Sequence, residues 1–213
     1  MKGVPDKEKL KHFEQLSRHH LEPWLRKINE NDQCFRWWFY HICQFYEIAT
    51  AVELGVNLAR TTCILATAVT DLAIGVEVAP DWAWIEKTIG DMPEQYRDKV
   101  YIVVGDSIAP QTVVAVEEIL GKKPLELLFI DSHHTAEHAT AELVAYMPML
   151  APVALVVMDD IINHPPLRDV FYSIPGIHVE MNHLHALGGS AWAKSPGQSG
   201  GFGAVIVNRN GEQ

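Results

Sequence analysis

Acidic residues that directly follow two short apolar runs are the strongest chemical signal in the sequence. Asp131 follows the run Leu125–Ile130, and Asp159 and Asp160 follow the run at 154–158. A helix-length segment separates the runs, so they are predicted to be neighbouring parallel strands of a strand–helix–strand unit. The carboxyl ends of such strands lie side by side, at the edge where open α/β sheets bind ligands. We therefore expect three carboxylates to converge there.

Three clustered carboxylates repel one another unless a cation or a proton neutralises them. A hard divalent cation such as Mg²⁺ suits them because it prefers oxygen ligands and keeps coordination positions for a substrate. The alternative is that Asp131 or Asp160 only caps the following turn or helix. Because side chains alternate along a strand, Asp159 and Asp160 are expected to point apart if the strand continues through them.

Histidines close to these acids suggest a second kind of chemistry. His134 lies three residues after Asp131, and a histidine there can take a proton from a hydroxyl near neutral pH. It can equally be a surface histidine in the first turn of the following helix. His133, His138 and His164 are also near in sequence, so a transition-metal site with mixed His and Asp ligands is the second interpretation.

Two earlier predicted strands also end in groups that suit a polar cofactor. The first reaches Glu53, turns at Gly55 and starts a helix near Thr61, where backbone N–H groups can hold an anionic or polar group. With one glycine, an ordinary tight turn explains this motif equally well. Glu77 lies near the end of the next strand, where nucleotide-binding folds place an acid for ribose hydroxyls.

Predicted strands and helices alternate through the middle of the chain, which is typical of an α/β fold. Strands are expected in the stretch 51–62 and at 72–78, Val100–Val104, Leu125–Ile130 and 154–158. Helices are expected at 61–69, 111–120, 133–150 and 167–174. Two late strands, 177–181 and 202–207, are joined by the Gly/Ser-rich loop 188–201 and should pair antiparallel at the sheet edge. We predict a Rossmann-like, doubly wound, mostly parallel seven-stranded sheet with an antiparallel last strand.

The N-terminal part carries helical patterns outside this sheet. Residues 1–46 are predicted to be a helical extension that packs on a core of residues 47–213, as one structural domain overall. Its segment Cys34–Tyr46 is rich in aromatics and has Arg36 as its single Arg, Lys, Asp or Glu residue. A helix buried against the sheet is expected; a lid over a ligand, or an interface that a homodimer would bury, is the alternative.

Composition narrows the functional class. The 213 residues are 48% hydrophobic, enough for one substantial core, and the net charge of −10 argues against a nucleic-acid backbone or an anionic membrane as partner. Cys34, Cys43 and Cys63 have no metal-ligand or redox spacing, so a reducing, cytoplasmic location is expected. Neither a targeting segment nor a bilayer-length apolar run is recognisable.

In order and spacing, these motifs resemble those of the class I S-adenosylmethionine-dependent methyltransferases. The resemblance covers about residues 50 to 165 and is nearest to metal-dependent O-methyltransferases of the catechol type and of the cephalosporin-hydroxylase and macrolide-sugar group. The segments that carry it are 53–61, 75–80, 105–107, 129–134 and 158–160. Ala59 and Arg60 stand where the family usually has a glycine. The resemblance implies that S-adenosylmethionine is bound by Glu53, Gly55, Asn57, Thr61, Glu77, Asp106, Ser107 and Asp131.

It also implies O-methylation of a small hydroxylated molecule. In this hypothesis Asp131, Asp159 and Asp160 hold one Mg²⁺ that lowers the pKa of the acceptor hydroxyl, and His134 takes its proton beside Asp131. The protein then contributes mainly alignment for in-line transfer. The competing hypotheses are a module that binds S-adenosylmethionine or a nucleotide without catalysis, and a dinucleotide-dependent oxidoreductase, although the phosphate turn G-x-G-x-x-G is missing.

Overall fold

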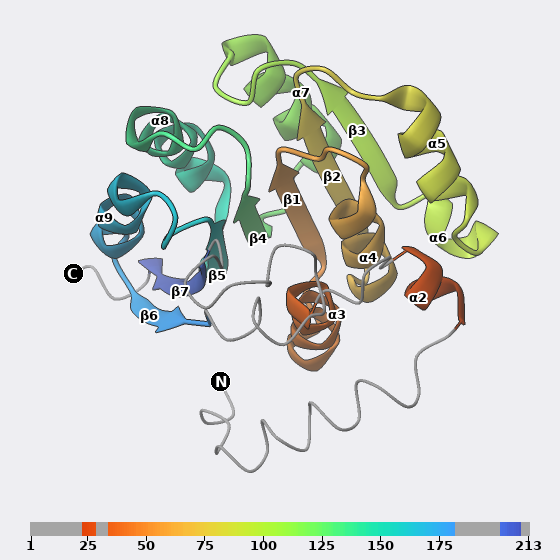
Figure 1. Cartoon of the computed structure of the whole chain (residues 1–213), viewed down its shortest axis with the longest axis horizontal. Coiled ribbons are helices and arrows are strands. Elements are labelled where there is room, and N and C mark those ends of the chain that lie inside the picture. Colours follow the sequence, from red (N-terminus) through yellow and green to blue (C-terminus); the bar gives the residue numbers. More distant parts are fainter. Residues whose placement is uncertain (1–22, 29–33, 182–200, 210–213) are drawn as a thin grey trace.

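The computed structural model describes residues 23–28, 34–181 and 201–209, and a single seven-stranded sheet runs through it (Figure 1). The strands are β1 (Thr50–Leu54), β2 (Leu72–Glu77), β3 (Val100–Val104), β4 (Leu125–Ile130), β5 (Leu150–Asp159), β6 (Ile177–Glu180) and β7 (Phe202–Asn208). Their order is β3-β2-β1-β4-β5-β7-β6, and β7 is antiparallel to both of its neighbours while the other pairs are parallel. The predicted fold class is confirmed.

Helices cover both faces of the sheet, which gives two apolar cores. One core joins the sheet to α2 (Pro23–Ile28), α3 (Cys34–Tyr46), α4 (Arg60–Ala68), α5 (Trp82–Gly90) and α6 (Glu94–Arg97). The other joins it to α7 (Pro110–Leu120), α8 (Ala136–Tyr146), the 3₁₀ turn Met147–Met149 and α9 (Pro165–Ser173). Within β1, Val52 and Leu54 face the second core and Ala51 the first, because strand side chains alternate.

Helix α3 is buried against the sheet, as its aromatic content predicts. Phe35, Trp37 and Phe39 are each at most 6% exposed. The Phe39 ring centroid lies 4.8 Å from that of Phe129 in β4 and 5.6 Å from that of Phe202 in β7. Helix α3 therefore closes the sheet over β4 and β7, next to the strand ends that carry the acidic residues.

Element boundaries differ from the sequence prediction in physically simple ways. The helix expected at 133–150 begins at Ala136, because the Thr135 side chain accepts a hydrogen bond from the His138 N–H and caps it. Pro148 falls in the 3₁₀ turn that ends this helix. His134 consequently lies in the loop after β4 and not in a helical turn.

Several predictions fall outside the described residues. These are the helical patterns before residue 23 and most of the Gly/Ser-rich loop at 188–201. Among the helices of the described ranges, none has the length and apolar character needed to cross a bilayer.

We expect Phe39→Ala to lower the free energy of unfolding by about 3–5 kcal/mol, because it removes a fully buried ring that packs against Phe129 of β4 and Phe202 of β7. Urea denaturation followed by circular dichroism measures the change. Phe45→Ala is the matched control, since Phe45 lies on the same helix with 52% of its surface exposed. Equal losses in both variants would contradict the packing described for α3.

Candidate functional site

The turn between β1 and α4 comes unusually close to the end of β4. Gly55 has φ +88°, and a Cβ at this position would lie 2.2 Å from the backbone oxygen of Asp131. Asn57 and Ala59 also have positive φ, 50° and 58°. Asparagine adopts this conformation readily, whereas alanine pays about 1–2 kcal/mol for it. Ala59 thus adopts a backbone conformation that favours glycine, the residue usual at this position in the family that the sequence resembles.

Glu77 at the end of β2 holds this turn. One carboxylate oxygen accepts hydrogen bonds from the backbone N–H groups of Val56, at 3.0 Å, and Asn57, at 2.9 Å, while the other accepts from Ala79 N–H at 3.1 Å. The predicted acid and the predicted Gly turn therefore form one unit. Val78, which sequence reasoning missed, follows Glu77 with 67% of its surface exposed and offers an apolar contact at the same edge.

Glu53 is a buried acid beneath the turn. It is 2% exposed, and the Thr62 hydroxyl donates a hydrogen bond to it. Burial raises the pKa of Glu53 to about 8, so this carboxyl is mostly protonated at neutral pH. The neighbouring Thr61, also predicted as a cofactor residue, is 4% exposed. Both side chains are therefore buried, and the cofactor-binding role of Glu53 and Thr61 stays a prediction.

Arg36 brings a positive charge from α3 to this edge, and sequence reasoning did not assign it to the site. Its Nε donates a hydrogen bond to the Thr61 hydroxyl at 3.2 Å. Burial lowers the pKa of Arg36 to about 10, while the charges of Glu53, Asp131 and Asp159 favour its protonated form. The feature of the sequence that could have indicated this role is that Arg36 is the single Arg, Lys, Asp or Glu residue of an aromatic helix.

His134 lies between two of the predicted acids. Its Nδ1 is 3.2 Å from Asp160 Oδ2, and its Nε2 is 3.8 Å from Asp131 Oδ1. Burial, followed by the charge of Asp159, raises the pKa of Asp131 to about 7. The interaction with Asp131 raises the pKa of His134 above its ordinary value, and the charge of Asp160 adds to this effect. Proximity to the two carboxylates therefore favours the protonated form of the His134 ring.

Asp160 turns the chain out of the sheet. Strand β5 ends at Asp159, and Asp160 has φ 58°, so strand alternation no longer decides where its side chain points. The Asp159 carboxylate accepts a hydrogen bond from the Asp160 N–H at 2.8 Å. The expectation that the two side chains must point apart rested on a strand that continues through both, and the strand does not.

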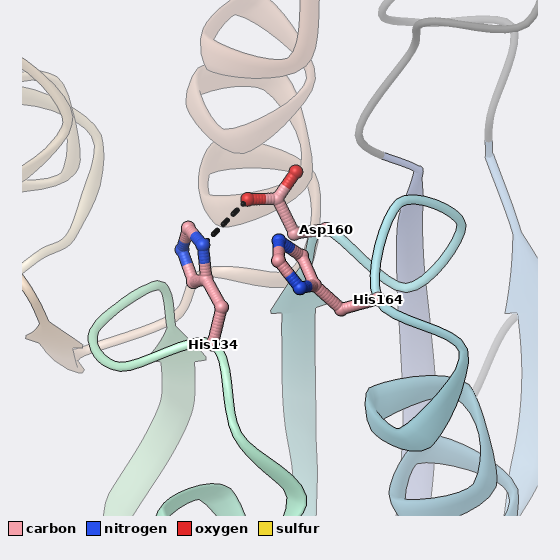
Figure 2. A group of neighbouring side chains, drawn as sticks. All are labelled: His134, Asp160 and His164. Atoms are coloured by element: carbon pink, nitrogen blue, oxygen red, sulfur yellow. Dashed lines mark ion pairs between the residues drawn. The ribbon is translucent and has the colours of Figure 1, made fainter.

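A group of three possible metal ligands forms at this edge from two loops (Figure 2). In the described part of the chain, His134, Asp160 and His164 each offer one ligand atom, and these atoms all lie within 4.8 Å of one another. The rings of His134 and His164 lie against each other at a tilt of 50°, with their centroids 4.9 Å apart. Asp160 is the one member shared with the predicted carboxylate set, so the metal-binding role of Asp131 and Asp159 stays a prediction.

Asp106 and Ser107, which the family resemblance implies lie on the adenine side of the cofactor, differ in their exposure. The Asp106 side chain is 51% exposed, and it accepts a hydrogen bond from the Ile108 N–H at 3.2 Å. Ser107 is 6% exposed, and its hydroxyl lies 3.0 Å from His138 Nε2. His138 thus belongs to this motif and not with His134. The cofactor role of Ser107 stays a prediction.

We expect Glu53→Gln to stabilise the protein increasingly as pH rises from about 4.5 to about 8. Across this window the unfolded chain ionises at Glu53 while the folded protein keeps it protonated, so wild-type stability falls relative to a residue that cannot ionise. Thermal unfolding of both proteins near each end of the window measures the difference. A Tm difference that does not change with pH would contradict the raised pKa.

A family model described as "Methyltransferase domain" matches residues 52–161, which is more than half of the chain. The match runs from β1 to the residue after Asp160 and includes the Gly turn, Glu77 and the acidic edge. None of the curated proteins compared with the chain matches it significantly in sequence.

Solved structures of similar shape cover nearly the whole chain. A putative caffeoyl-CoA O-methyltransferase from Staphylococcus aureus has a TM-score of 0.66 at 14% identity, covering 95% of this chain and 100% of that one. An O-methyltransferase from Bacillus cereus in complex with S-adenosylhomocysteine (SAH) has a TM-score of 0.61 at 14% identity, covering 96% and 93%. TomG from Streptomyces achromogenes, an O-methyltransferase in complex with S-adenosylmethionine, has 0.61 at 14%, covering 96% and 100%. At these identities the likeness shows the fold, and with the family match it establishes that the chain belongs to the methyltransferase domain family and has the class I fold.

Proposed function

We propose that the chain is an S-adenosylmethionine-dependent O-methyltransferase that acts on a hydroxyl of a small molecule with the help of a divalent cation. The observation that carries this proposal is the contact between Gly55 and Asp131, because it joins a cofactor-type turn to an edge of acids and histidines. The net charge of −10 also favours a small acceptor over nucleic acid.

The residues present fit the cofactor. The turn at Gly55 leaves no Cβ between itself and the end of β4, Glu77 stands beside it with a carboxylate for ribose hydroxyls, and Asp106 is exposed on the adenine side. S-adenosylmethionine supplies an electrophilic methyl group on its sulfonium sulfur. The O-methyltransferases of similar fold that contain this cofactor or its thioether product support the assignment.

His134 is the residue best placed to remove the acceptor proton. Asp160 and Asp131 flank its two ring nitrogens and stabilise the imidazolium that forms when it accepts the proton. With S-adenosylmethionine bound, the deprotonated hydroxyl oxygen would take the methyl group, the thioether would be the leaving group, and His134 would hold the proton. Positioning the oxygen in line with the sulfonium methyl is the remaining task of the site.

The chemistry of the donor set also fits a divalent cation. Carboxylates of Asp131, Asp159 and Asp160 suit Mg²⁺, whereas His134, Asp160 and His164 suit a transition metal such as Zn²⁺ or Mn²⁺. A bound cation would act as a Lewis acid on the acceptor hydroxyl. We favour the carboxylate set because it leaves His134 free to act as base, although the ligand atoms found within 4.8 Å of one another in the described residues are those of His134, Asp160 and His164.

The cofactor assignment is tested by calorimetric titration with SAH and with NAD, each with and without Mg²⁺. We expect SAH to bind and NAD not to bind, because the turn has a single glycine and no phosphate-binding G-x-G-x-x-G sequence. Binding of NAD alone would refute the methyltransferase proposal. Binding of SAH without transfer from labelled S-adenosylmethionine to a panel of catechols and sugars would favour a catalytically inactive module.

We expect His134→Asn to reduce methyl transfer by about 10²–10⁴-fold, the usual contribution of a general base, and to leave SAH and Mg²⁺ binding unchanged. The wild-type rate should rise with pH through the raised pKa of His134, because only the neutral ring accepts a proton; the variant should lack this limb.

His164→Asn serves as the matched variant from the same group of ligands. Co²⁺ absorption spectra of both variants separate the two metal sites. Loss of Co²⁺ binding in both would show that the histidines are ligands and would remove His134 as the base.

A further inference from the structure

Helix α8 presents a polar stripe to the interior, where an amphipathic helix normally buries apolar side chains. His138, Glu142 and Tyr146 follow one another at intervals of four residues, so they share one face of the helix. Glu142 and Tyr146 are both 0% exposed. An internal carboxyl group is costly to bury, so its presence calls for specific partners.

Glu142 joins two loops through a single oxygen. Its Oε1 accepts hydrogen bonds from the Ser107 hydroxyl and from the Ser132 hydroxyl, each at 2.5 Å. Ser107 follows Asp106 in the loop after β3, and Ser132 follows Asp131 in the loop after β4. The two loops belong to strands that are not neighbours in the sheet, so strand pairing does not set the distance between them.

The remaining members of the stripe hold Ser107 from other sides. Tyr146 donates a hydrogen bond to the Ser107 carbonyl at 3.1 Å, and His138 Nε2 lies 3.0 Å from the Ser107 hydroxyl. The single hydroxyl proton of Ser107 goes to Glu142, so His138 must carry its proton on Nε2 to donate in return. With this tautomer of His138, every hydrogen bond of the cluster has one donor and one acceptor.

A purely structural role does not account for a carboxyl group here. Among the described residues, the second oxygen of Glu142 is buried without a hydrogen-bond partner. When all partners of a buried polar cluster are replaced together by apolar residues of similar size, the effect on folding is often neutral or stabilising. The carboxyl group is better explained by what it positions, because the loop it holds at Ser132 continues from Asp131, whose backbone oxygen packs against Gly55.

We infer that Glu142 is a positioning residue of the cofactor site: by tying Ser107 to Ser132 it sets the spacing between the adenosine side, at Asp106, and the reaction side, at Asp131. The inference rests on the proposed function, since it assumes that S-adenosylmethionine occupies this edge. Glu142 itself is 0% exposed, so we infer no direct contact with the cofactor. Its effect passes through the two serines.

The test compares Glu142→Leu with Glu142→Gln. Leucine removes the acceptor that the two serines share. We expect the affinity for SAH to fall by about 10- to 100-fold, because both hydroxyls lose their buried hydrogen-bond partner. The amide oxygen of glutamine can still accept from both serines, so Glu142→Gln should stay within about threefold of wild type. In the cofactor-free protein, backbone amides of residues 105–109 and 131–134 should exchange hydrogen faster in the leucine variant only.

Leu143→Ala is the matched control, because Leu143 is the adjacent core residue of α8 and lies 8% exposed in the apolar core. It should lower Tm without lowering SAH affinity. The inference is overturned if Glu142→Leu lowers Tm but binds SAH as wild type does, if Leu143→Ala loses as much affinity, or if glutamine fails to rescue. Absence of SAH binding to the wild-type protein would instead refute the proposed function, and this inference with it.

A serine cycle keeps the inference testable if Glu142→Leu does not fold. Ser107→Ala and Ser132→Ala should each weaken SAH binding, and the double variant should lose less than the sum of the two, because both act through one oxygen. Additive losses would show that the two loops are held independently and would overturn the inference.

Discussion

Parallel pairing of β1 with β4 brings Gly55 against the backbone of Asp131, and the rest of the site depends on this contact. A side chain at position 55 would overlap the Asp131 backbone, so the turn and the strand end could not meet. With glycine there, the turn that Glu77 holds and the edge that carries His134 form one continuous surface. The cofactor and the acceptor can then lie side by side, as methyl transfer requires.

The negative charge of the acidic residues at this edge is partly offset by protonation and by positively charged side chains. Asp131, Asp159 and Asp160 concentrate negative charge, and burial keeps the Asp131 carboxyl partly protonated near neutral pH. Arg36 from α3 and His134 from the loop after β4 add positive charge. The negative charge of the three carboxylates is therefore offset in part by side chains from two other parts of the chain.

The interior on the opposite side of the sheet uses polar groups for a different purpose. Glu142, His138 and Tyr146 are hydrogen-bonded to a loop residue, while Tyr146 is also a fully buried member of the apolar core. In sequence, their spacing of four residues was visible, but such a pattern is equally typical of a solvated helix face. Only burial distinguishes the two, and burial depends on which side of α8 meets the sheet.

Much of the fold could be predicted from the sequence, because apolar runs alternate with helical patterns and each run ends in a polar turn. Glu53, Gly55, Glu77 and Asp131 were recognised for the same local reason: their positions at strand ends follow from the pattern itself. What joins them is the strand order, which places β4 beside β1 and β5 beside β4.

Tertiary structure alone decided how side chains combine across those ends. It separated His138 from His134, brought His164 and Asp160 to His134, and drew Arg36 in from a distant helix. The left-handed backbone of Asp160 shows why: one residue's conformation redirected a side chain that strand alternation would have sent elsewhere. The sequence by itself determined which residues stand at the edge, because that depends on local pattern; their partners depended on loop geometry and packing between distant segments, which local pattern does not encode.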